Sequence, residues 1–347
     1  MANALISMLD LAKLKGTDQE IGLLEDTLTY APELSTLMGR PIVGTQYKTA
    51  HRTLPTVAFR QPNTGSDTIK GTYRQTLKEC ALIDAQLQAD KAVVDAQGRG
   101  DGPEGSSEDM LVTEAQGVIM ATYITIGAQV WYGTSSDANG FVGVNALTGS
   151  LNAAKNKNPA VIGAGGSAAN ACSSAYLVWE NIRGSHFIFG NNAALTMLPE
   201  WRVQQVLDAN NKPYTAYVNN LQGWLGFAVN HPNSVARIAN INLASSSKPL
   251  TDILVASLLS YLPLQMRQEV IANANTGAPN KWGPGLKLFV NPLTAYSLQQ
   301  SRSPIVSGVG TAITAAESLR FAELPTASNG IPIVITDSIT QTEAQVT

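Results

Sequence analysis

A chain of 347 residues with 44% hydrophobic residues is long enough for one large or two ordinary domains with a buried core. Its net charge of −3 gives no general attraction to nucleic acid, which argues against a dedicated DNA-binding protein. Charged residues make up only 14% of the chain, against about 25% in typical soluble domains. The sparse charge indicates either extensive contact between subunits or a plain neutral surface.

The first forty residues predict short amphipathic helices rather than a domain. Apolar residues recur at helical spacing in two groups, Leu5, Met8, Leu9 and Ala12, then Ile21, Leu24 and Leu28. These stripes need a partner surface, so residues 1–41 are predicted to form an arm. The segment lacks the basic region and cleavage site of a secretory signal, which favours a cytoplasmic setting.

Residues 42–92 predict a long β-hairpin, because β-type alternation runs on both sides of the turn sequence PNTGSD. An isolated hairpin has no second layer on which to bury a face, so it should be stable only on another surface. Between Arg40 and Cys80 seven basic residues stand against two acidic ones, a net charge of +5. The candidate contact residues are Arg52, Arg60, Lys70, Arg74 and Lys78.

Residues 95–114 carry the opposite charge, with six acidic residues against one basic residue, a net charge of −5. We expect the hairpin to contact this segment in a neighbouring subunit, and two unrelated solvated surfaces are the alternative. The segment does not match an EF-hand, because Gln97 and Arg99 occupy ligand positions, and only loose cation binding stays open. Its candidate contact residues are Asp101, Glu104, Glu108, Asp109 and Glu114.

The strongest predicted helix spans residues 107–132, with a serine N-cap, acidic residues in its first turn and Gly133 at its end. No charge occurs from Ala115 to Ser136, a length that could cross a bilayer. Polar residues interrupt this run, its upstream flank is acidic and no basic cluster fixes an orientation. We therefore predict a long helix packed within protein, and no membrane partner.

The rest of the chain mixes strands and helices. Residues 150–174 predict a surface loop, and strand-like runs between 174 and 242 predict a sheet in which 215–220 and 223–230 are separate strands. After a polar break at 245–248, a capped helix, a strand–helix unit and a last strand follow. This pattern indicates an α+β fold.

Motifs that would support catalysis are weak. The glycine-rich segment VIGAGGSAANA contains Gly163, Gly165 and Gly166 and is similar to a dinucleotide-binding turn. Such a turn must open a helix, whereas a strand-like run begins at Ala175, so an NAD-binding enzyme is a remote alternative. The histidines and cysteines lack metal-ligand spacing, and no nucleophile elbow or phosphate loop is present. The sequence predicts no catalytic residue, no cofactor and no metal, and therefore a protein that is not an enzyme.

The order of elements resembles a known family. It resembles the major capsid protein of tailed double-stranded DNA phages, with the Hong Kong 97-type fold. The elements that carry the resemblance are, in order, a helical arm, a long hairpin, an acidic glycine-rich link, a long helix, the motif G-F-x-G-x-x-A-L and a sheet. Four further segments resemble podovirus-type coat proteins: FGNN at 189–192, GWLGFAVN at 223–230, LTDILVASLL at 250–259 and NGIPIVITDSI at 329–339.

The resemblance implies an α+β capsid fold with a definite division of the chain. Residues 1–41 would be the N-terminal arm, 42–92 the extended E-loop, 93–245 a P domain with a spine helix at 107–132 and a sheet, and 246–347 the A domain. Some of 140–200 is assignable to the A domain instead. A permuted order of A and P segments is expected, because a sheet segment directly follows the spine helix.

The function implied by the resemblance is self-assembly, as hexamers and pentamers, into the icosahedral head that encloses phage double-stranded DNA. The implied partners are other copies of the chain, a separate scaffolding protein, a portal protein at one vertex, a decoration protein and the packaged DNA, contacted non-specifically. The chain would be a component of the virion and would assemble in the bacterial host cytoplasm. The alternative within this fold is the shell protein of an encapsulin-type nanocompartment.

Overall fold

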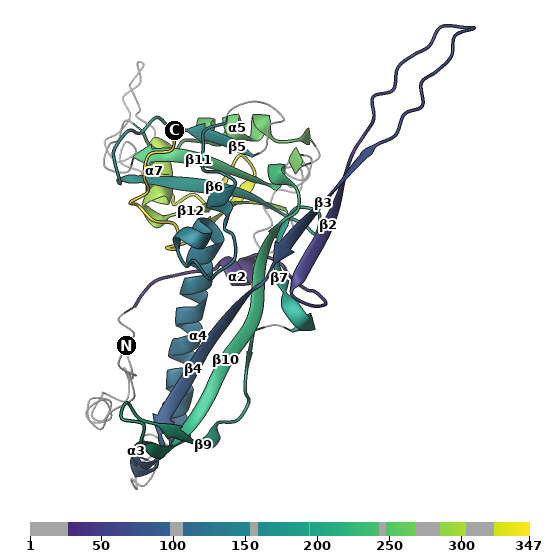
Figure 1. Ribbon diagram of the computed structural model, residues 1–347. Helices are drawn as coiled ribbons and strands as arrows, with labels where there is room; N and C mark the ends of the chain where they lie inside the picture. Colours follow the sequence, from purple (N-terminus) through teal and green to yellow (C-terminus); the bar gives the residue numbers. More distant parts are fainter. Residues whose placement is uncertain are drawn as a thin grey trace, which may run out of the picture.

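The computed structural model describes residues 27–97, 107–152, 159–193, 195–242, 248–264, 266–267, 285–302 and 323–347. The molecule is elongated, with a globular upper region, a narrow lower region and a hairpin that projects away from both (Figure 1). The helices expected within residues 1–26 and the acidic link at 98–106 lie outside the described residues. The elements that are described confirm the α+β class.

The lower region is built on the long helix that the sequence predicts. Helix α4 spans Ser107–Tyr132, which matches the predicted bounds. It contacts strand β4 (Ala81–Asp90) and helix α3 (Lys91–Gln97). Toward these elements it buries Leu111 and Ile126. The 3-10 turn η1 (Gly133–Ser135) follows it directly.

Strand β10 (Pro213–Val229) joins the lower region to the upper region. It pairs antiparallel with β4 and then, near its end, with β7 (Ser185–Phe189). The short strand β8 (Thr196–Met197) and strand β9 (Arg202–Leu207) pair with its other edge. The prediction of two separate strands here is wrong, because Leu221 and Gln222 at the expected break pair with β4 on one side and β8 on the other.

In the upper region a single sheet collects strands from distant stretches of the chain. Its order is β13 (Ala327–Ser328), β14 (Ile331–Ile335), β12 (Gly285–Val290), β6 (Cys172–Glu180), β7, β10 and β4. Strand β11 (Val235–Asn242) pairs with β6 and with β5 (Ala160–Gly163). Helices α5 (Asp252–Tyr261) and α7 (Pro292–Arg302) pack on this sheet and bury Leu258 and Leu298 in its core.

The pairing of β6 with β12 joins segments from both sides of residue 245. Gly285 lies opposite Glu180 and Val290 opposite Ala175, so segments expected in the P and A domains share one sheet. The predicted boundary rests on the polar break at 245–248. That break lies between β11 and α5, and both of these elements belong to the upper region. The polar segment therefore connects two elements of the same region.

The paired hairpin is shorter than the predicted range of 42–92. Strands β2 (Gln46–Thr53) and β3 (Thr72–Glu79) form a separate two-stranded sheet. Residues 81–90, expected to continue the hairpin, form β4 and pair with β10 instead. Alternation identifies a half-buried strand but carries no information about which strand will be its partner.

The predicted surface loop at 150–174 is also only partly correct. Ala160, Val161 and Ile162 form β5 and are buried beside β11. Most of the small residues that follow, from Gly163 to Asn170, are exposed or half-buried, as expected of a loop.

The motif G-F-x-G-x-x-A-L wraps the end of α4 and forms the 3-10 turn η2 (Val144–Ala146). Gly133 adopts a φ of 57°, and a Cβ on it would lie 2.8 Å from the Cα of Gly143. The side-chain amide of Gln129 donates to the carbonyl oxygen of Phe141 at 2.6 Å. The two glycines are therefore required because backbone packs directly on backbone.

The helix meets the upper sheet through aromatic side chains. The ring of Trp131 stacks on Tyr176 at 4.9 Å and tilts against Phe289 at 5.0 Å. All three rings are fully buried. This contact holds the long helix rigidly beneath the sheet.

Candidate intersubunit surface

The hairpin carries the basic residues that the sequence singles out, and its register divides them between two faces. Arg74 lies opposite His51 and Lys78 opposite Tyr47, which places this pair of basic residues on one face. Arg52 lies opposite Tyr73 on the other face. Inside the sheet, the hydroxyl groups of Thr49 and Thr76 form a hydrogen bond of 2.6 Å.

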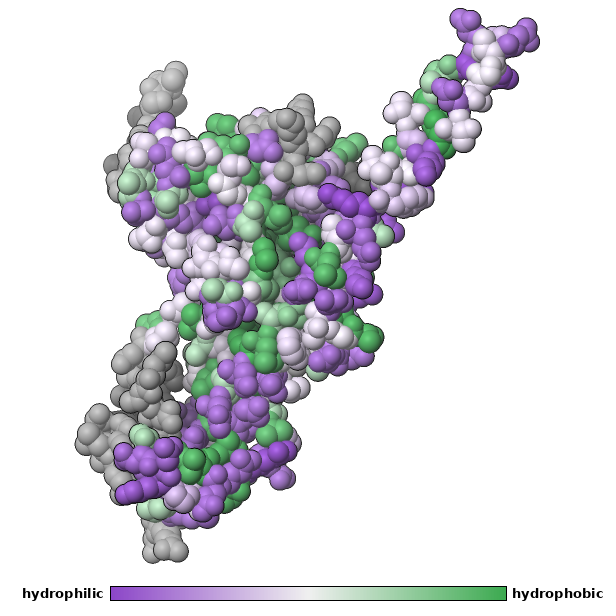
Figure 2. Space-filling view, viewed as in Figure 1, coloured by the Kyte–Doolittle hydropathy of each residue, from purple (hydrophilic) through white to green (hydrophobic). Residues whose placement is uncertain are grey.

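The tip of the hairpin, residues 54–71, extends into solvent (Figures 1 and 2). Its apolar side chains are uncovered, with exposed fractions of 71% for Leu54, 77% for Val57 and 108% for Phe59. Arg60 and Lys70 are exposed in the same segment. A soluble surface rarely keeps such apolar residues together without a partner, so the tip has the character of a contact site.

The root of the hairpin is fixed to the sheet. The short strand β1 (Gly39–Pro41) pairs with β7, and Ile42 and Cys80 pack against Ile188 and Ala228. The backbone N–H of Ile42 donates to the carbonyl oxygen of Phe189 at 2.7 Å. The hairpin therefore leaves the body from a rigid base.

Tyr47 completes this base. Its hydroxyl oxygen accepts a hydrogen bond of 3.2 Å from the side chain of Asn230, and its ring lies edge-on to His186 at 5.7 Å. Burial lowers the pKa of His186, so this ring stays neutral against its aromatic neighbour. Burial also lowers the pKa of Lys78, which lies opposite Tyr47.

Two adjoining hollows lie beside the root. They have volumes of about 450 and 880 Å³ and share Ala81 and Phe141 in their walls. Leu77, Leu82 and Val142 contribute apolar side chains that are 47%, 45% and 56% exposed. This area is a second apolar surface that faces away from the body core.

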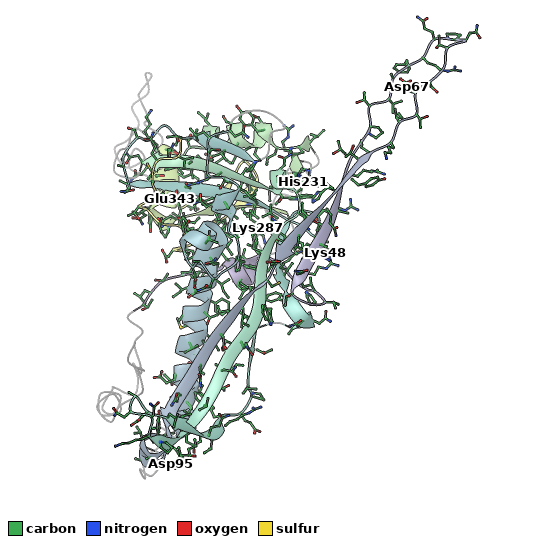
Figure 3. All side chains as sticks on the ribbon, in the orientation of Figure 1. Lys48, Asp67, Asp95, His231, Lys287 and Glu343 are labelled. Atoms are coloured by element: carbon green, nitrogen blue, oxygen red, sulfur yellow. The ribbon has the colours of Figure 1, made fainter. Side chains whose placement is uncertain are left out.

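The acidic candidates lie elsewhere. Asp101 and Glu104 fall outside the described residues, as do the side chains of Glu108 and Asp109, although both residues belong to α4. Glu114 is half-buried on α4. Figure 3 shows Asp95 at the lower end of the molecule and Asp67 at the far tip of the hairpin. The structure does not bring the acidic and basic segments of one chain together.

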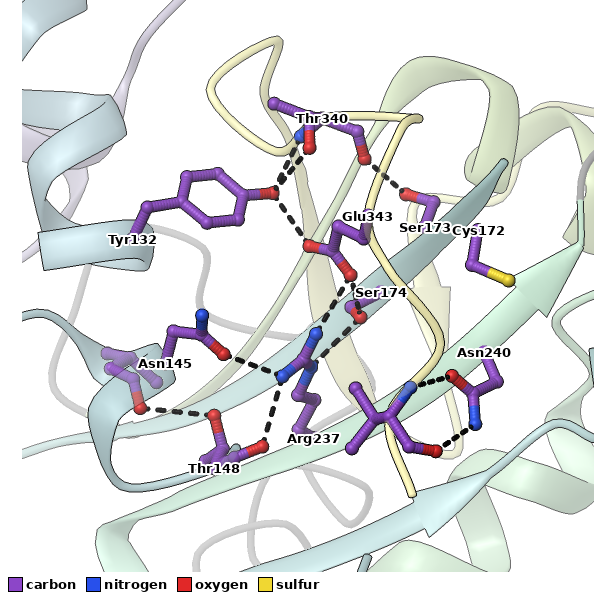
Figure 4. Close-up of polar contacts among 12 residues, drawn as sticks. Tyr132, Asn145, Thr148, Cys172, Ser173, Ser174, Arg237, Asn240, Thr340 and Glu343 are labelled. Carbon is purple, nitrogen blue, oxygen red and sulfur yellow. Dashed lines mark hydrogen bonds and ion pairs between the residues drawn. The ribbon is translucent and has the colours of Figure 1, made fainter. Parts of the chain in front are cut away.

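The structure also shows buried charges that the sequence reasoning missed. Arg237 on β11 pairs with Glu343 at 2.9 Å, and Ser174 donates to the same carboxylate (Figure 4). Lys287 on β12 pairs with Glu180 on β6, and the exposed fractions of their side chains are 0% and 4%. A single charge inside an apolar strand of a chain with few charges is the signal that could have indicated both pairs.

A third buried group anchors the last part of the predicted arm. Glu33, in the short helix α2 (Glu33–Thr36), accepts hydrogen bonds from Trp131 at 2.8 Å and Thr336 at 2.5 Å. Its carboxyl group is fully buried, and burial raises its pKa. Elsewhere, the 3-10 turn η3 (Gly190–Asn192) contacts β1 and β10, and the 3-10 turn η4 (Pro232–Ser234) contacts β6.

The glycine-rich segment does not form a dinucleotide site. Strand β5 ends at Gly163, and the described residues 164–171 lead to β6 without a helix. A Cβ on Gly166 would lie 3.0 Å from the side chain of Asn242, so this glycine fits against β11. Among the described residues, no group of three His, Cys, Asp or Glu side chains could hold a metal ion.

The mixed fold, the long helix under a sheet and the projecting hairpin define a capsid subunit of the Hong Kong 97-like class. The chain belongs to the family of major capsid protein GP7, whose model matches residues 43–347. It is accordingly a major capsid protein of a tailed phage. The search of curated proteins returned no match.

Solved structures similar to this chain include phage capsids and an encapsulin. A chain of bacteriophage Epsilon15 matches with a TM-score of 0.67 and 18% identity, over 100% of this chain and 98% of that one. The bacteriophage JBD30 capsid gives a TM-score of 0.42 with 14% identity, over 96% and 99% of the two chains. An encapsulin complex from Synechococcus elongatus gives a TM-score of 0.39 with 8% identity, over 69% and 98%. The family match favours a phage capsid over the encapsulin alternative.

Proposed function

We propose that this chain assembles as hexamers and pentamers into an icosahedral head that encloses double-stranded DNA, and that it acts as a structural subunit and not as an enzyme. The observation that carries the proposal is the hairpin. Its tip exposes Leu54, Val57 and Phe59 on a rigid base, at a distance from the body of its own chain. No part of the described chain covers this tip, and another molecule would cover it in the assembled head.

The distribution of charge supports contact with a specific surface of a neighbouring subunit. The hairpin region is basic and the start of α4 follows an acidic segment, but Figure 3 places the two at opposite ends of the molecule. A contact between them needs a second copy of the chain. We propose that Arg60, Lys70 and Arg74 approach the acidic residues around the start of α4 in that copy.

The regions of the chain take corresponding roles in this proposal. Residues 46–79 would be the E-loop. The P domain would contain α4 with β4 and β10, and the A domain would contain the upper sheet with α5 and α7. This division follows the strand pairing.

Further partners belong to the same proposal. A separate scaffolding protein would guide assembly in the bacterial host cytoplasm, and a portal protein would replace subunits at one vertex. A decoration protein would bind the finished head, and the DNA inside would be contacted without sequence specificity. The net charge of −3 supports this weak and non-specific role toward DNA.

The test is co-expression with the scaffolding protein of the same phage, followed by electron microscopy. Wild-type protein should form closed shells, and strictly monomeric protein under these conditions would overturn the proposed function. Reversal of Arg60, Lys70 and Arg74 to Glu should prevent closed shells. The matched control reverses Arg183, Arg202 and Lys212, which are exposed outside the hairpin.

A second part of this experiment tests the acidic surface of the neighbouring subunit. Substituting Glu108, Asp109 and Glu114 by Lys should restore shells to the hairpin variant, because the attraction is re-formed with opposite signs. If the hairpin variant assembles as well as the wild type, the proposed contact is wrong while the shell function stands.

A further inference from the structure

The three histidines of the chain, His51, His186 and His231, lie where the hairpin meets the body. His51 belongs to β2 of the hairpin, His186 to β7 of the body, and His231 follows β10. Figure 3 shows His231 beside the base of the hairpin. Histidine is the side chain whose ordinary pKa lies closest to neutrality, so this junction changes its charge with pH.

His186 is the buried member of the three. It is 0% exposed, and neither ring nitrogen makes a hydrogen bond of ordinary geometry with the described residues. Its ring lies edge-on to Tyr47 of the hairpin at 5.7 Å. Burial lowers the pKa of His186, the backbone of Asn181 acts in the opposite direction, and the positive charge of Arg40 on β1 lowers it further. A second proton on this ring would therefore be a buried charge without a partner.

His231 and His51 act on each other across the junction. Burial lowers the pKa of His231, and the charge of His51 lowers it further. The Nδ1 atom of His231 accepts a hydrogen bond of 3.2 Å from the backbone N–H of Asn233, and a proton on Nδ1 would break this bond. In acid the two rings carry like charges, which repel.

The other charged groups on the hairpin side of the junction are basic. The face of the hairpin that contacts the body carries His51 opposite Arg74 and Tyr47 opposite Lys78. Within the paired residues of β2 and β3 this face has no carboxylate, because Glu79 lies on the other face. Protonated histidines would therefore add positive charge to a face that is already positive.

The described residues of the body offer no free carboxylate to these rings either. Strand β1 contributes Arg40, and the loop before β7 contributes Arg183. Glu180 at the end of β6 is already in the buried ion pair with β12, and β10 places an alanine opposite His186. The thiol of Cys80 at the hairpin root is neutral, because burial raises its pKa.

We propose that the three histidines make the hairpin root an acid-sensitive hinge, in which their protonation releases the hairpin from the body while β2 and β3 stay paired. The pKa values of His186 and His231 are lowered in the docked state, so the released state binds protons more tightly. Docking is fully stable above the ordinary pKa of 6.5 and weakens as the pH falls below it. The inference concerns the single subunit and does not depend on shell formation.

The experiment measures the distance between two nitroxide labels in the unassembled full-length chain by pulsed electron paramagnetic resonance. The labels are attached to Ala50→Cys on the hairpin and Asn210→Cys between β9 and β10, which are exposed and uncharged positions. Between about pH 8 and about pH 5 the single docked distance should broaden, with a roughly tenfold fall in the ratio of docked to released hairpins. Cys80 and Cys172 are buried, and the chain without the two new cysteines measures their background labelling.

The comparison variant carries His51→Gln, His186→Phe and His231→Gln. None of the three replacements titrates, and phenylalanine keeps an aromatic ring against Tyr47. This variant should keep the docked distance at about pH 5. The matched control is Lys48→Gln, which removes a positive charge from the opposite face of the same hairpin and should broaden as the wild type does.

Broadening in the wild type that the histidine variant lacks supports the proposal. An unchanged wild-type distance, or equal broadening in the histidine variant, would overturn it. Circular dichroism at each pH follows the body, and broadening that coincides with loss of the β-sheet signal would mean acid unfolding and would also overturn it. His231→Gln alone, at an exposed position, should lower the pH of half-release, which keeps the comparison if the triple variant does not dock. An unchanged pH of half-release would then overturn the proposal.

Discussion

Arg237 and Glu343 form a buried ion pair whose side chains are 3% and 6% exposed. Arg237 also donates to Asn145 at 2.8 Å and to the carbonyl oxygen of Thr148 at 3.0 Å. The pair joins β11, the loop after α4 and the segment around residue 343. Removing one partner of such a pair leaves an uncompensated buried charge.

Glu343→Ala should lower the free energy of unfolding by about 3–5 kcal/mol, because Arg237 would remain charged and buried. Urea denaturation of the unassembled subunit measures this change. Lys91→Ala is the control, since Lys91 and Asp95 form an ion pair whose side chains are 37% and 43% exposed. Equal losses in the two variants would contradict the assignment.

Glu33 predicts how stability depends on pH. Its pKa is raised above the ordinary value of 4.5, mainly because burial penalises the carboxylate. The folded state therefore binds this proton more tightly than the unfolded state does. The stabilisation is fully present below pH 4.5 and is lost as the pH rises through the pKa of the folded state.

Glu33→Gln should remove this dependence, because an amide keeps the shape and accepts the hydrogen bond from Trp131 without titrating. We expect the difference in unfolding free energy between variant and wild type to move in favour of the variant from pH 4.5 to pH 8. Urea midpoints over this range check the prediction. A difference that stays constant with pH would show that Glu33 does not titrate there.

At the scale of elements, α4 contains two internal glycines with different surroundings. A Cβ on Gly117 would meet nothing within 4 Å, whereas a Cβ on Gly127 would clash with the hydroxyl of Ser338 and approach Ala31 at 3.1 Å. One glycine only weakens the helix. The other makes room for the segment at residues 31–33.

Gly117→Ala should therefore stabilise the protein by about 0.5–1 kcal/mol, through helix propensity. Gly127→Ala should destabilise it by about 1–3 kcal/mol, since overpacking exceeds the same gain in propensity. Thermal unfolding of the two variants, which carry the same substitution in the same helix, gives a direct comparison. The packing assignment is wrong if both variants gain stability.

The limits of prediction from sequence are visible in the same elements. The bounds of α4 are predicted correctly, because caps, charges in the first turn and Gly133 are local signals. The partner of residues 81–90 is not predicted, since alternation does not encode which strand lies alongside. Of the candidate intersubunit surface, the sequence predicts the basic residues of the hairpin. It does not predict the strand register or the exposure of the apolar residues at the tip, which depend on the three-dimensional structure.

The buried pairs could be predicted only to a limited extent. Arg237 and Lys287 stand out as charges in apolar strands, and the sequence does show that each needs a partner. Which carboxylate supplies it depends on the pairing of β6, β11 and β12, which is non-local. The contact between Arg60 and an acidic neighbour stays a prediction for the same reason.

At the scale of the whole molecule, the hairpin tip takes no part in the hydrophobic core of the body. The last strand pair of the hairpin joins Thr53 to Thr72, and residues 54–71 extend beyond it into solvent. The core clusters of the body contain none of these residues. Folding and assembly should therefore be separable by one deletion.

Replacing residues 54–71 by an Asn–Gly turn between Thr53 and Thr72 should leave the free energy of unfolding within about 0.5 kcal/mol of the wild type. The same variant should form no closed shells with the scaffolding protein. Circular dichroism in urea and electron microscopy provide the two measurements. Shells from this variant would show that other surfaces suffice for assembly.

The ion pair between Arg237 and Glu343 also has a consequence for the order of events during synthesis. Its two residues are 106 positions apart, so a ribosome adding about 5–20 residues per second needs roughly 5 to 20 seconds to pass from one to the other. During that interval the arginine exists without its carboxylate partner. Strand β12 pairs with β14 (Ile331–Ile335), so a nascent chain that stalls before β14 presents an open strand edge as well as an unpaired Arg237.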